Sequence, residues 1–276
     1  MKFNLPLFAL RKTIPKAQFV ILGSITLLCV VGWYLHLSYK QHVENPYDTT
    51  IPSLTQMKDG LIKAAMVDED KGYRWIVADF IATTTTLTIS MSVAVTLGIL
   101  LGVLMGSFGY FEALFFPTLS IAKQIMPFVM MAVFFVTVNL GIQLYTAIVC
   151  FGAVPILALT VALTIKDVPK ELEYKALTLG ASTAEVITNV FVPLALPKVI
   201  DTVRLLTGQA LGYIIVAEML VGTVGLGYRI RLQQKVLEMG VVYPYILLMA
   251  LFTFVLVDLL LKNAELWLCK WNRERR

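Results

Sequence analysis

Residues 171–197 of this chain read ELEYKALTLGASTAEVITNVFVPLALP, a polar stretch that lies between long apolar segments. The residues from Val168 to Leu179 are mainly good helix formers, such as Lys, Glu, Leu and Ala. Gly180 interrupts this pattern, and a glycine at a helix end typically adopts a conformation that stops the helix. The first half of the stretch therefore predicts one short helix that ends at Gly180.

The second half of the stretch carries signals for a helix start and a helix stop. Ser182, with Glu185 three residues later, matches the pattern of a capping box. We predict a second short helix from there to about Val192, ending at Pro193, because proline lacks the amide proton that a helix interior uses. Pro197 follows closely. Two short helices joined at a glycine and held outside a bilayer indicate a docking surface, not a catalytic pocket.

The composition of the chain is that of an integral membrane protein. Of its 276 residues, 58% are hydrophobic and 15% are charged, and the mean hydropathy is +0.78. A soluble domain carries about 25% charged residues. The net charge of +5 does not indicate nucleic-acid binding, because the basic residues are sorted by membrane side. Three scattered cysteines and two histidines, without a Cys-x-x-Cys, give no basis for a metal site.

Uncharged runs predict six membrane-spanning helices and an all-α membrane protein, since one crossing needs about 20 apolar residues. The first run, Ala17–Leu37, has no Ala-x-Ala cleavage site after it and is expected to be a retained anchor. The other predicted spans are Phe80–Phe111, two spans within 113–165 that are separated at Asn139 to Gln143, Leu205–Leu220 and Val241–Leu261. Lys123 lies inside the third of the six.

Basic residues in both tails predict that both termini are cytoplasmic. The N-terminal tail carries Lys2, Arg11, Lys12 and Lys16 without an acid, and the C-terminal tail carries five basic and two acidic residues. The predicted organisation is a cytoplasmic tail and first anchor (1–40), an extracytoplasmic segment (41–77), a membrane core (78–262) with a cytoplasmic loop (166–202), and a basic cytoplasmic tail (263–276). Against this trend, three basic residues fall on the outer side and are candidates to face an anionic substrate or its carrier: Arg229, Arg231 and Lys235.

Three glycines, Gly98, Gly102 and Gly106, repeat every four residues on one face of the second span. Small residues at this spacing allow another helix to approach closely within a membrane. Both packing within the chain and a contact with a second copy fit the pattern.

Polar residues within or beside the predicted spans are candidates for a translocation path, because ionisable groups in a membrane are costly. Lys123 either extends to the inner surface or lines the path, and Glu218 has either a structural or a path role. The remaining candidates can each serve instead as a hydrogen bond between helices: Gln124, Asn139, Gln143, Thr207 and Gln209.

The sequence offers no catalytic motif. It contains no Gly-x-x-x-x-Gly-Lys-Ser/Thr loop for phosphate, no His-Glu-x-x-His and no Gly-x-Ser-x-Gly. We therefore expect that the chain is not an enzyme, holds no metal or cofactor, and depends on another chain for energy if it moves solute uphill.

The stretch around Gly180 resembles the EAA loop of binding-protein-dependent ABC transporter permeases, in which a Glu-Ala-Ala triplet begins six residues before a glycine and Ile-x-Leu-Pro follows ten residues after it. Val190 to Pro193 matches the second element, whereas Tyr174-Lys175-Ala176 departs from the triplet and Glu173 lies one place early. Further motifs resemble the nitrate/taurine/sulfonate branch, over roughly Ile51 to Asp258: Pro52-Ser53, Pro117, Lys123-x-x-Met126-Pro127, Ala217-Glu218-Met219-Leu220 and Gly225-Leu226-Gly227-Tyr228.

The resemblance implies the inner-membrane permease subunit of a bacterial ABC importer with a type I permease fold, for a small solute such as nitrate, a sulfonate or taurine. It implies two ABC ATPase subunits that bind ATP and Mg, an extracytoplasmic solute-binding protein and a second permease copy, with no nucleic-acid partner. The residues implied to couple to the ATPase are Glu173, Tyr174, Lys175, Ala176, Gly180, Ala181, Ser182 and Pro193.

Two rival functions are weighed against this one. A self-sufficient secondary transporter or channel predicts paired acids at mid-bilayer or an inverted repeat. An intramembrane enzyme requires a nucleophile, a base or a metal set within the spans. The sequence contains neither set of features.

Overall fold

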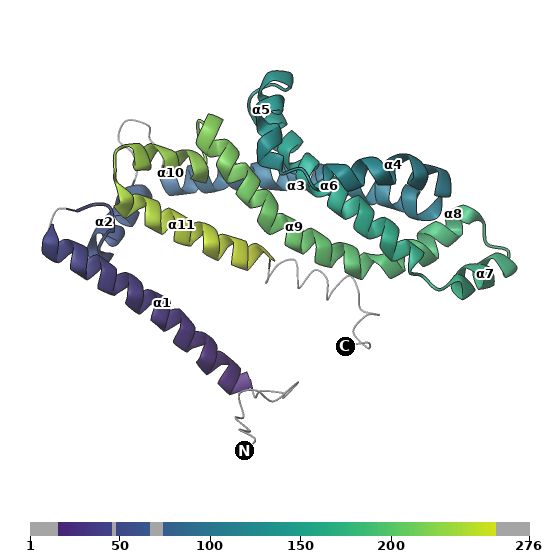
Figure 1. Ribbon diagram of the computed structural model, residues 1–276, viewed down its shortest axis with the longest axis horizontal. Coiled ribbons are helices and arrows are strands. Elements are labelled where there is room, and N and C mark those ends of the chain that lie inside the picture. The colour runs from purple at the N-terminus through teal and green to yellow at the C-terminus, as the bar shows by residue number, and fades with distance from the viewer. Residues whose placement is uncertain (1–15, 46–47, 67–73, 258–276) are drawn as a thin grey trace, which may run out of the picture.

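The computed structural model describes the chain except residues 1–15, 46–47, 67–73 and 258–276 (Figure 1). The described chain is built from helices. They are α1 (Lys16–Glu44), α2 (Leu54–Ala65), α3 (Trp75–Ser107), α4 (Gly109–Ala122), α5 (Pro127–Thr137), α6 (Ile142–Lys166), α7 (Lys170–Thr178), α8 (Thr183–Val186), the π-helix η2 (Ile187–Phe191), α9 (Val192–Val221), α10 (Leu226–Lys235) and α11 (Met239–Phe254). The all-α prediction is confirmed.

Among the described residues, five helical segments are long and apolar enough to cross a membrane, or six if a bent pair counts as one span. The five are Val20–Glu44, Trp75–Ser107, Ile142–Lys166, Thr183–Val221 and Met239–Val257. The bent pair is α4 with α5, which meet at an angle of 103°. The predicted third span is thus broken: the chain turns at Lys123, and Pro127 starts a new helix, as proline readily does at a first helical position.

The core of the molecule lies between α3, α6 and α9, which run side by side along its length (Figure 1). Leu87, Leu157, Val161 and Leu206 are among its buried members. The α3–α6 contact is close because glycines leave room on α3. A Cβ atom at Gly102 would lie 2.5 Å from Cβ of Val161.

The prediction that a helix ends at Pro193 is wrong. The helix that starts at Thr183 continues through η2 into α9 and reaches Val221. In η2 the hydrogen bonds shift by one residue, so that the Val192 amide donates to the Ile187 carbonyl. This shift accommodates a proline that can neither donate a bond nor fit the regular turn. The second helix of the loop is thus the extended end of a span.

The two ends of the bundle carry different elements. Helices α7 and α8 lie at one end, and α2 and α10 lie at the other (Figure 1). Helix α1 meets the bundle near α2 and diverges from α11 along its length. The basic residues at 2, 11 and 12, the acidic run 68–70 and the C-terminal tail lie outside the described residues.

Candidate functional site

The loop around Gly180, which we call the coupling loop (residues 170–186), is organised by its own backbone. Gly180 has φ +89°, and the amides of Gly180 and Ala181 donate to the carbonyls of Leu177 (3.0 Å) and Ala176 (3.1 Å). This pair of bonds defines a Schellman motif, in which the left-handed residue is usually glycine. A Cβ atom at Gly180 would meet no atom within 4 Å. The position is therefore constrained by backbone conformation, not by space.

The start of α8 has the capping box that the sequence predicts. The Glu185 amide donates to Ser182 Oγ (3.4 Å), and the Ser182 amide donates to Glu185 Oε2 (2.7 Å). These bonds satisfy amides that would otherwise lack partners at a helix start. The angle between α7 and α8 is thus set by local bonds on both sides of Gly180.

The coupling loop presents apolar side chains to its surroundings. Tyr174 is 61% exposed and Leu179 is 89% exposed. Leu172 and Leu177 are also exposed, as is Lys175, whereas Glu173, Ala176, Ala181 and Pro193 are half-buried. Exposed apolar residues gathered on a short loop are typical of a protein contact surface.

The candidate path residues are spread over several segments. Lys123 and Gln124 are exposed at the break between α4 and α5, Asn139 and Gln143 are exposed around the turn into α6, and Gln209 is exposed on α9. Thr207 is buried, and its hydroxyl donates to the Val203 carbonyl of its own helix (2.8 Å). In the part of the chain that the structure describes, no hydrogen bond joins any two of these six residues.

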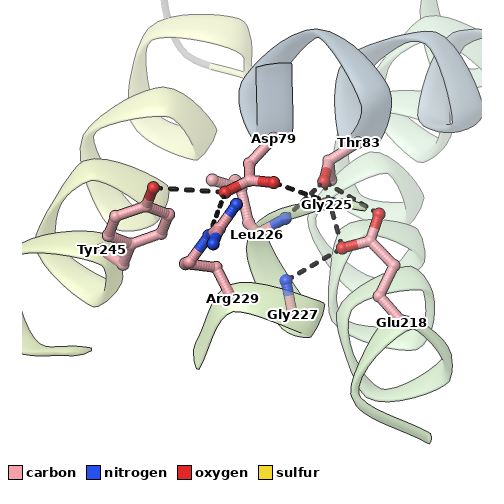
Figure 2. A network of polar contacts seen from close by, with 8 residues as sticks. All are labelled: Asp79, Thr83, Glu218, Gly225, Leu226, Gly227, Arg229 and Tyr245. Atoms are coloured by element: carbon pink, nitrogen blue, oxygen red, sulfur yellow. Dashed lines mark hydrogen bonds and ion pairs between the residues drawn. The ribbon is translucent and has the colours of Figure 1, made fainter. Parts of the chain in front are cut away.

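Glu218 belongs instead to a buried network of charged and polar groups, which we call the polar clasp. Its side chains are Asp79 and Thr83 of α3, Glu218 of α9, Arg229 of α10 and Tyr245 of α11 (Figure 2). Asp79 is 0% exposed, Glu218 1% and Arg229 3%. The clasp joins residues of four helices, and its most distant bonded pair, Asp79 and Tyr245, is 166 residues apart in the sequence.

The clasp caps the N-terminus of α10 with side chains from other helices. The amides of Gly225, Leu226 and Gly227 donate to Asp79 Oδ1 (3.2 Å), Thr83 Oγ1 (3.0 Å) and Glu218 Oε2 (2.9 Å), respectively. Thr83 Oγ1 in turn donates to Glu218 Oε1 (2.8 Å). Carboxylates are favourable at this position because a helix N-terminus carries partial positive charge.

Arg229 supplies the positive charge of the clasp. Its Nε donates to Asp79 Oδ2 at 2.8 Å, and the Tyr245 hydroxyl donates to the same oxygen at 3.2 Å. The guanidinium also lies 4.4 Å from the centre of the Trp75 ring. A buried ion pair requires such additional partners to offset the loss of hydration. The network is thus a closed structural unit, with its polar groups directed at each other.

Two glycines make this packing possible. A Cβ atom at Gly225, which has φ +130°, would lie 2.5 Å from the Glu218 carboxyl carbon, and one at Gly227 would lie 2.2 Å from the Ile215 carbonyl oxygen. The Gly-Leu-Gly motif of residues 225–227 therefore allows α10 to lie against the end of α9.

The prediction that Arg229 faces an external anion is wrong, since its side chain is enclosed. Arg231 donates to the carbonyls of Leu220 (2.8 Å) and Gly222 (3.4 Å) at the end of α9, and Lys235 is exposed. Asp79 was not predicted from the sequence as a site residue, because it lies at the end of a polar segment that precedes the second predicted span. Asp79 and Thr83, four residues apart, share a helix face, and this spacing was the available signal.

Comparisons with known proteins agree with the fold. The family model described as "Binding-protein-dependent transport system inner membrane component" matches residues 94–264. The taurine transport system permease protein TauC of Escherichia coli (strain K12) is 32% identical over 99 residues, which is 36% of this chain and 36% of that protein. The match thus spans about a third of this curated relative.

Two solved structures have a similar fold. They are inward-facing conformations of the MetNI methionine ABC transporter, in a native and a selenomethionine-soak crystal form. Their TM-scores are 0.64 and 0.62 at 17% and 18% identity, and each alignment covers 73% of this chain and 99% of the other. At this identity the likeness concerns the fold alone. With the family model matching more than half of its length, this chain belongs to the family of binding-protein-dependent transport system inner membrane components, and it is a multi-pass inner-membrane protein.

Proposed function

We propose that the chain is the transmembrane permease subunit of an ABC importer and works as a pair around a central path. Separate ATPase subunits bind ATP and Mg, and an extracytoplasmic solute-binding protein delivers the solute. Family membership supports this role, and the sequence lacks a phosphate-binding loop of its own.

The observation that carries the proposal is the geometry of the coupling loop. Gly180 fixes a turn between α7 and α8, and the second helix continues through η2 into the span α9. A force applied to α8 by a partner is therefore transmitted to α9 without an intervening flexible joint. Exposed apolar residues such as Tyr174 and Leu179 provide the surface for that partner. Such a rigid lever suits a transporter that alternates between two states.

The proposed orientation places the coupling loop in the cytoplasm and the clasp end outside. The positive-inside rule applied to both tails supports this arrangement. The two elements lie at opposite ends of the bundle (Figure 1), so an ATPase at one end and a solute-binding protein at the other can act simultaneously.

The proposed solute is a small anion such as nitrate, a sulfonate or taurine. The 32% identity to a taurine transport permease over 99 residues supports this class, together with the motifs around Ala217 to Tyr228. The residues proposed to line the translocation path are the exposed polar ones, Lys123, Gln124, Asn139, Gln143 and Gln209.

Co-purification followed by mass spectrometry of the bound proteins tests the proposal. An ABC ATPase and a solute-binding protein should be recovered with the tagged chain from native membranes, and the chain freed of them should hydrolyse no ATP. Solute uptake by vesicles that contain only this chain would instead favour a secondary transporter or channel.

A further inference from the structure

A groove between α2 and α11 combines an apolar floor with one cationic side chain. Met57 and Leu61 of α2 and Pro244, Leu247 and Leu251 of α11 contribute to its apolar wall, and Lys58 also lines it. Its volume of about 420 Å³ falls within the range of small-molecule sites, which is about 300–1,000 Å³.

Close contact of two glycines brings α2 against α11 beside the groove. A Cβ atom at Gly60 of α2 would lie 2.3 Å from the carbonyl oxygen of Gly240, at the start of α11. Helix α2 therefore lies across the first turn of α11 with Gly60 and Ala64 buried. Met57 and Leu61 of the same helix line the groove beside this contact.

The α11 wall of the groove is exposed. Leu247 is 60% exposed and Leu251 is 63% exposed, although α11 belongs to a segment that qualifies as a membrane span. Helix α1 reaches one side of the groove, where the Tyr34 hydroxyl donates to Met57 Sδ (3.7 Å) and the rings of Tyr34 and Tyr243 lie 5.7 Å apart, and then diverges from α11 (Figure 1). An exposed apolar flank on a segment of this kind is suited to contact with lipid.

Lys58 gives the groove a charged end. The other lysine of α2, Lys63, forms an ion pair with Glu238 at 2.6 Å, whereas Lys58 has no ion pair or hydrogen bond among the described residues. Because α2 crosses the start of α11, Lys58 lies near the membrane surface. The groove extends from there to Leu251, and Leu251 lies seven residues after Pro244, a rise of about 10 Å along the helix.

We propose that this groove binds an anionic phospholipid, with the phosphate at Lys58 and one acyl chain along α11 as far as Leu251. The charge and the apolar wall match the two parts of such a lipid, and a lysine can extend its ammonium to the headgroup level while its methylenes remain apolar contacts. The site requires only that the protein lies in a membrane and does not depend on the proposed transport function.

Native mass spectrometry of the full-length protein in detergent tests the site, with dioleoylphosphatidylglycerol and dioleoylphosphatidylcholine as probes that share acyl chains. We expect tighter retention of phosphatidylglycerol, and Lys58→Gln should weaken it about fivefold, the contribution of one lysine near an anionic surface. Lys63→Gln is the matched control on the same helix and should leave the preference unchanged. Leu247→Trp, which fills the groove, should reduce retention of both lipids.

Equal retention of the two lipids by the natural protein would overturn the proposal, as would an unchanged preference in Lys58→Gln. Occupation by protein is tested with Leu247→Cys under oxidising conditions. A disulfide from this position to a second copy, or to Cys269 of the tail, would mean that protein covers the groove and would contradict the lipid assignment. Absence of both crosslinks, together with weaker retention of phosphatidylglycerol by Lys58→Gln, would support the lipid assignment.

Discussion

The polar clasp and the coupling loop lie at opposite ends of the bundle and are stabilised in opposite ways (Figure 1). The clasp is buried and joins residues as distant as Asp79 and Tyr245. The coupling loop is exposed and depends on bonds between residues at most five positions apart, such as that from Ala181 to Ala176. The clasp satisfies its own polar groups, whereas the loop leaves apolar side chains such as Leu179 uncovered.

This difference separates a structural region from one that acts on a partner. Substitutions in the clasp leave buried charges or amides without partners, so their main effect should be on stability. Substitutions in the coupling loop alter the angle between the exposed helices α7 and α8, so their main effect should be on function. We therefore expect substitutions to destabilise the fold most at the clasp end of the bundle and least at the coupling-loop end.

The largest loss of stability is expected for Asp79→Ala. It leaves Arg229 charged, buried and unpaired, which costs about 3–5 kcal/mol. The matched control is Lys63→Ala, which removes an ion pair at the same end whose side chains are 52% and 40% exposed and should cost about 1 kcal/mol or less. Thermal unfolding in detergent measures both.

Replacing both charges sharpens this prediction. Asp79→Ala combined with Arg229→Met removes the unpaired cation and should recover part of the lost stability. Equal melting temperatures for Asp79→Ala and the natural protein would show that the clasp does not stabilise the bundle.

A smaller loss is expected for Gly102→Leu on α3. The new side chain would meet Val161 and the Ala158 carbonyl, which lie 2.5 and 2.8 Å from the added Cβ atom. Overpacking of this kind costs about 1–3 kcal/mol. Gly23→Leu on α1 serves as the control, because a Cβ atom there meets nothing within 4 Å. Unchanged unfolding of Gly102→Leu would contradict the described α3–α6 packing.

Ser182→Ala in the coupling loop should cost less than Asp79→Ala or Gly102→Leu. It removes an N-cap, a change worth about 1 kcal/mol, at a position exposed at the surface. Calorimetry should find at most a slight shift in the melting temperature. A loss as large as that of Asp79→Ala would mean that the loop is part of the folding core.

Cysteine labelling tests which side of the membrane each region occupies. In a background without the natural cysteines, Lys235→Cys near the clasp should react with an impermeant maleimide in intact cells. Lys175→Cys in the loop should react only after lysis. The reverse pattern would invert the proposed orientation.

Local patterns in the sequence predicted the loop well and the clasp poorly. The capping box of Ser182 and Glu185 and the turn at Gly180 depend on neighbouring residues, so spacing alone predicts them. The break at Lys123 and the continuation of the helix through Pro193 depend on how segments pack and on a shift in hydrogen bonding, which composition does not reveal. Asp79 and Arg229 are 150 residues apart, and only the three-dimensional fold brings them together.

The proposed function depends on the angle between α7 and α8, and Gly180→Val tests this dependence most directly. Valine at φ +89° is strained because of its branched Cβ, whereas Gly180→Asn is a matched control that tolerates this conformation. Uptake of the solute and ATPase pull-down are measured together for both variants at equal membrane abundance. The account predicts that valine abolishes uptake and weakens ATPase binding while asparagine retains both. Normal uptake with normal ATPase binding in Gly180→Val would contradict it.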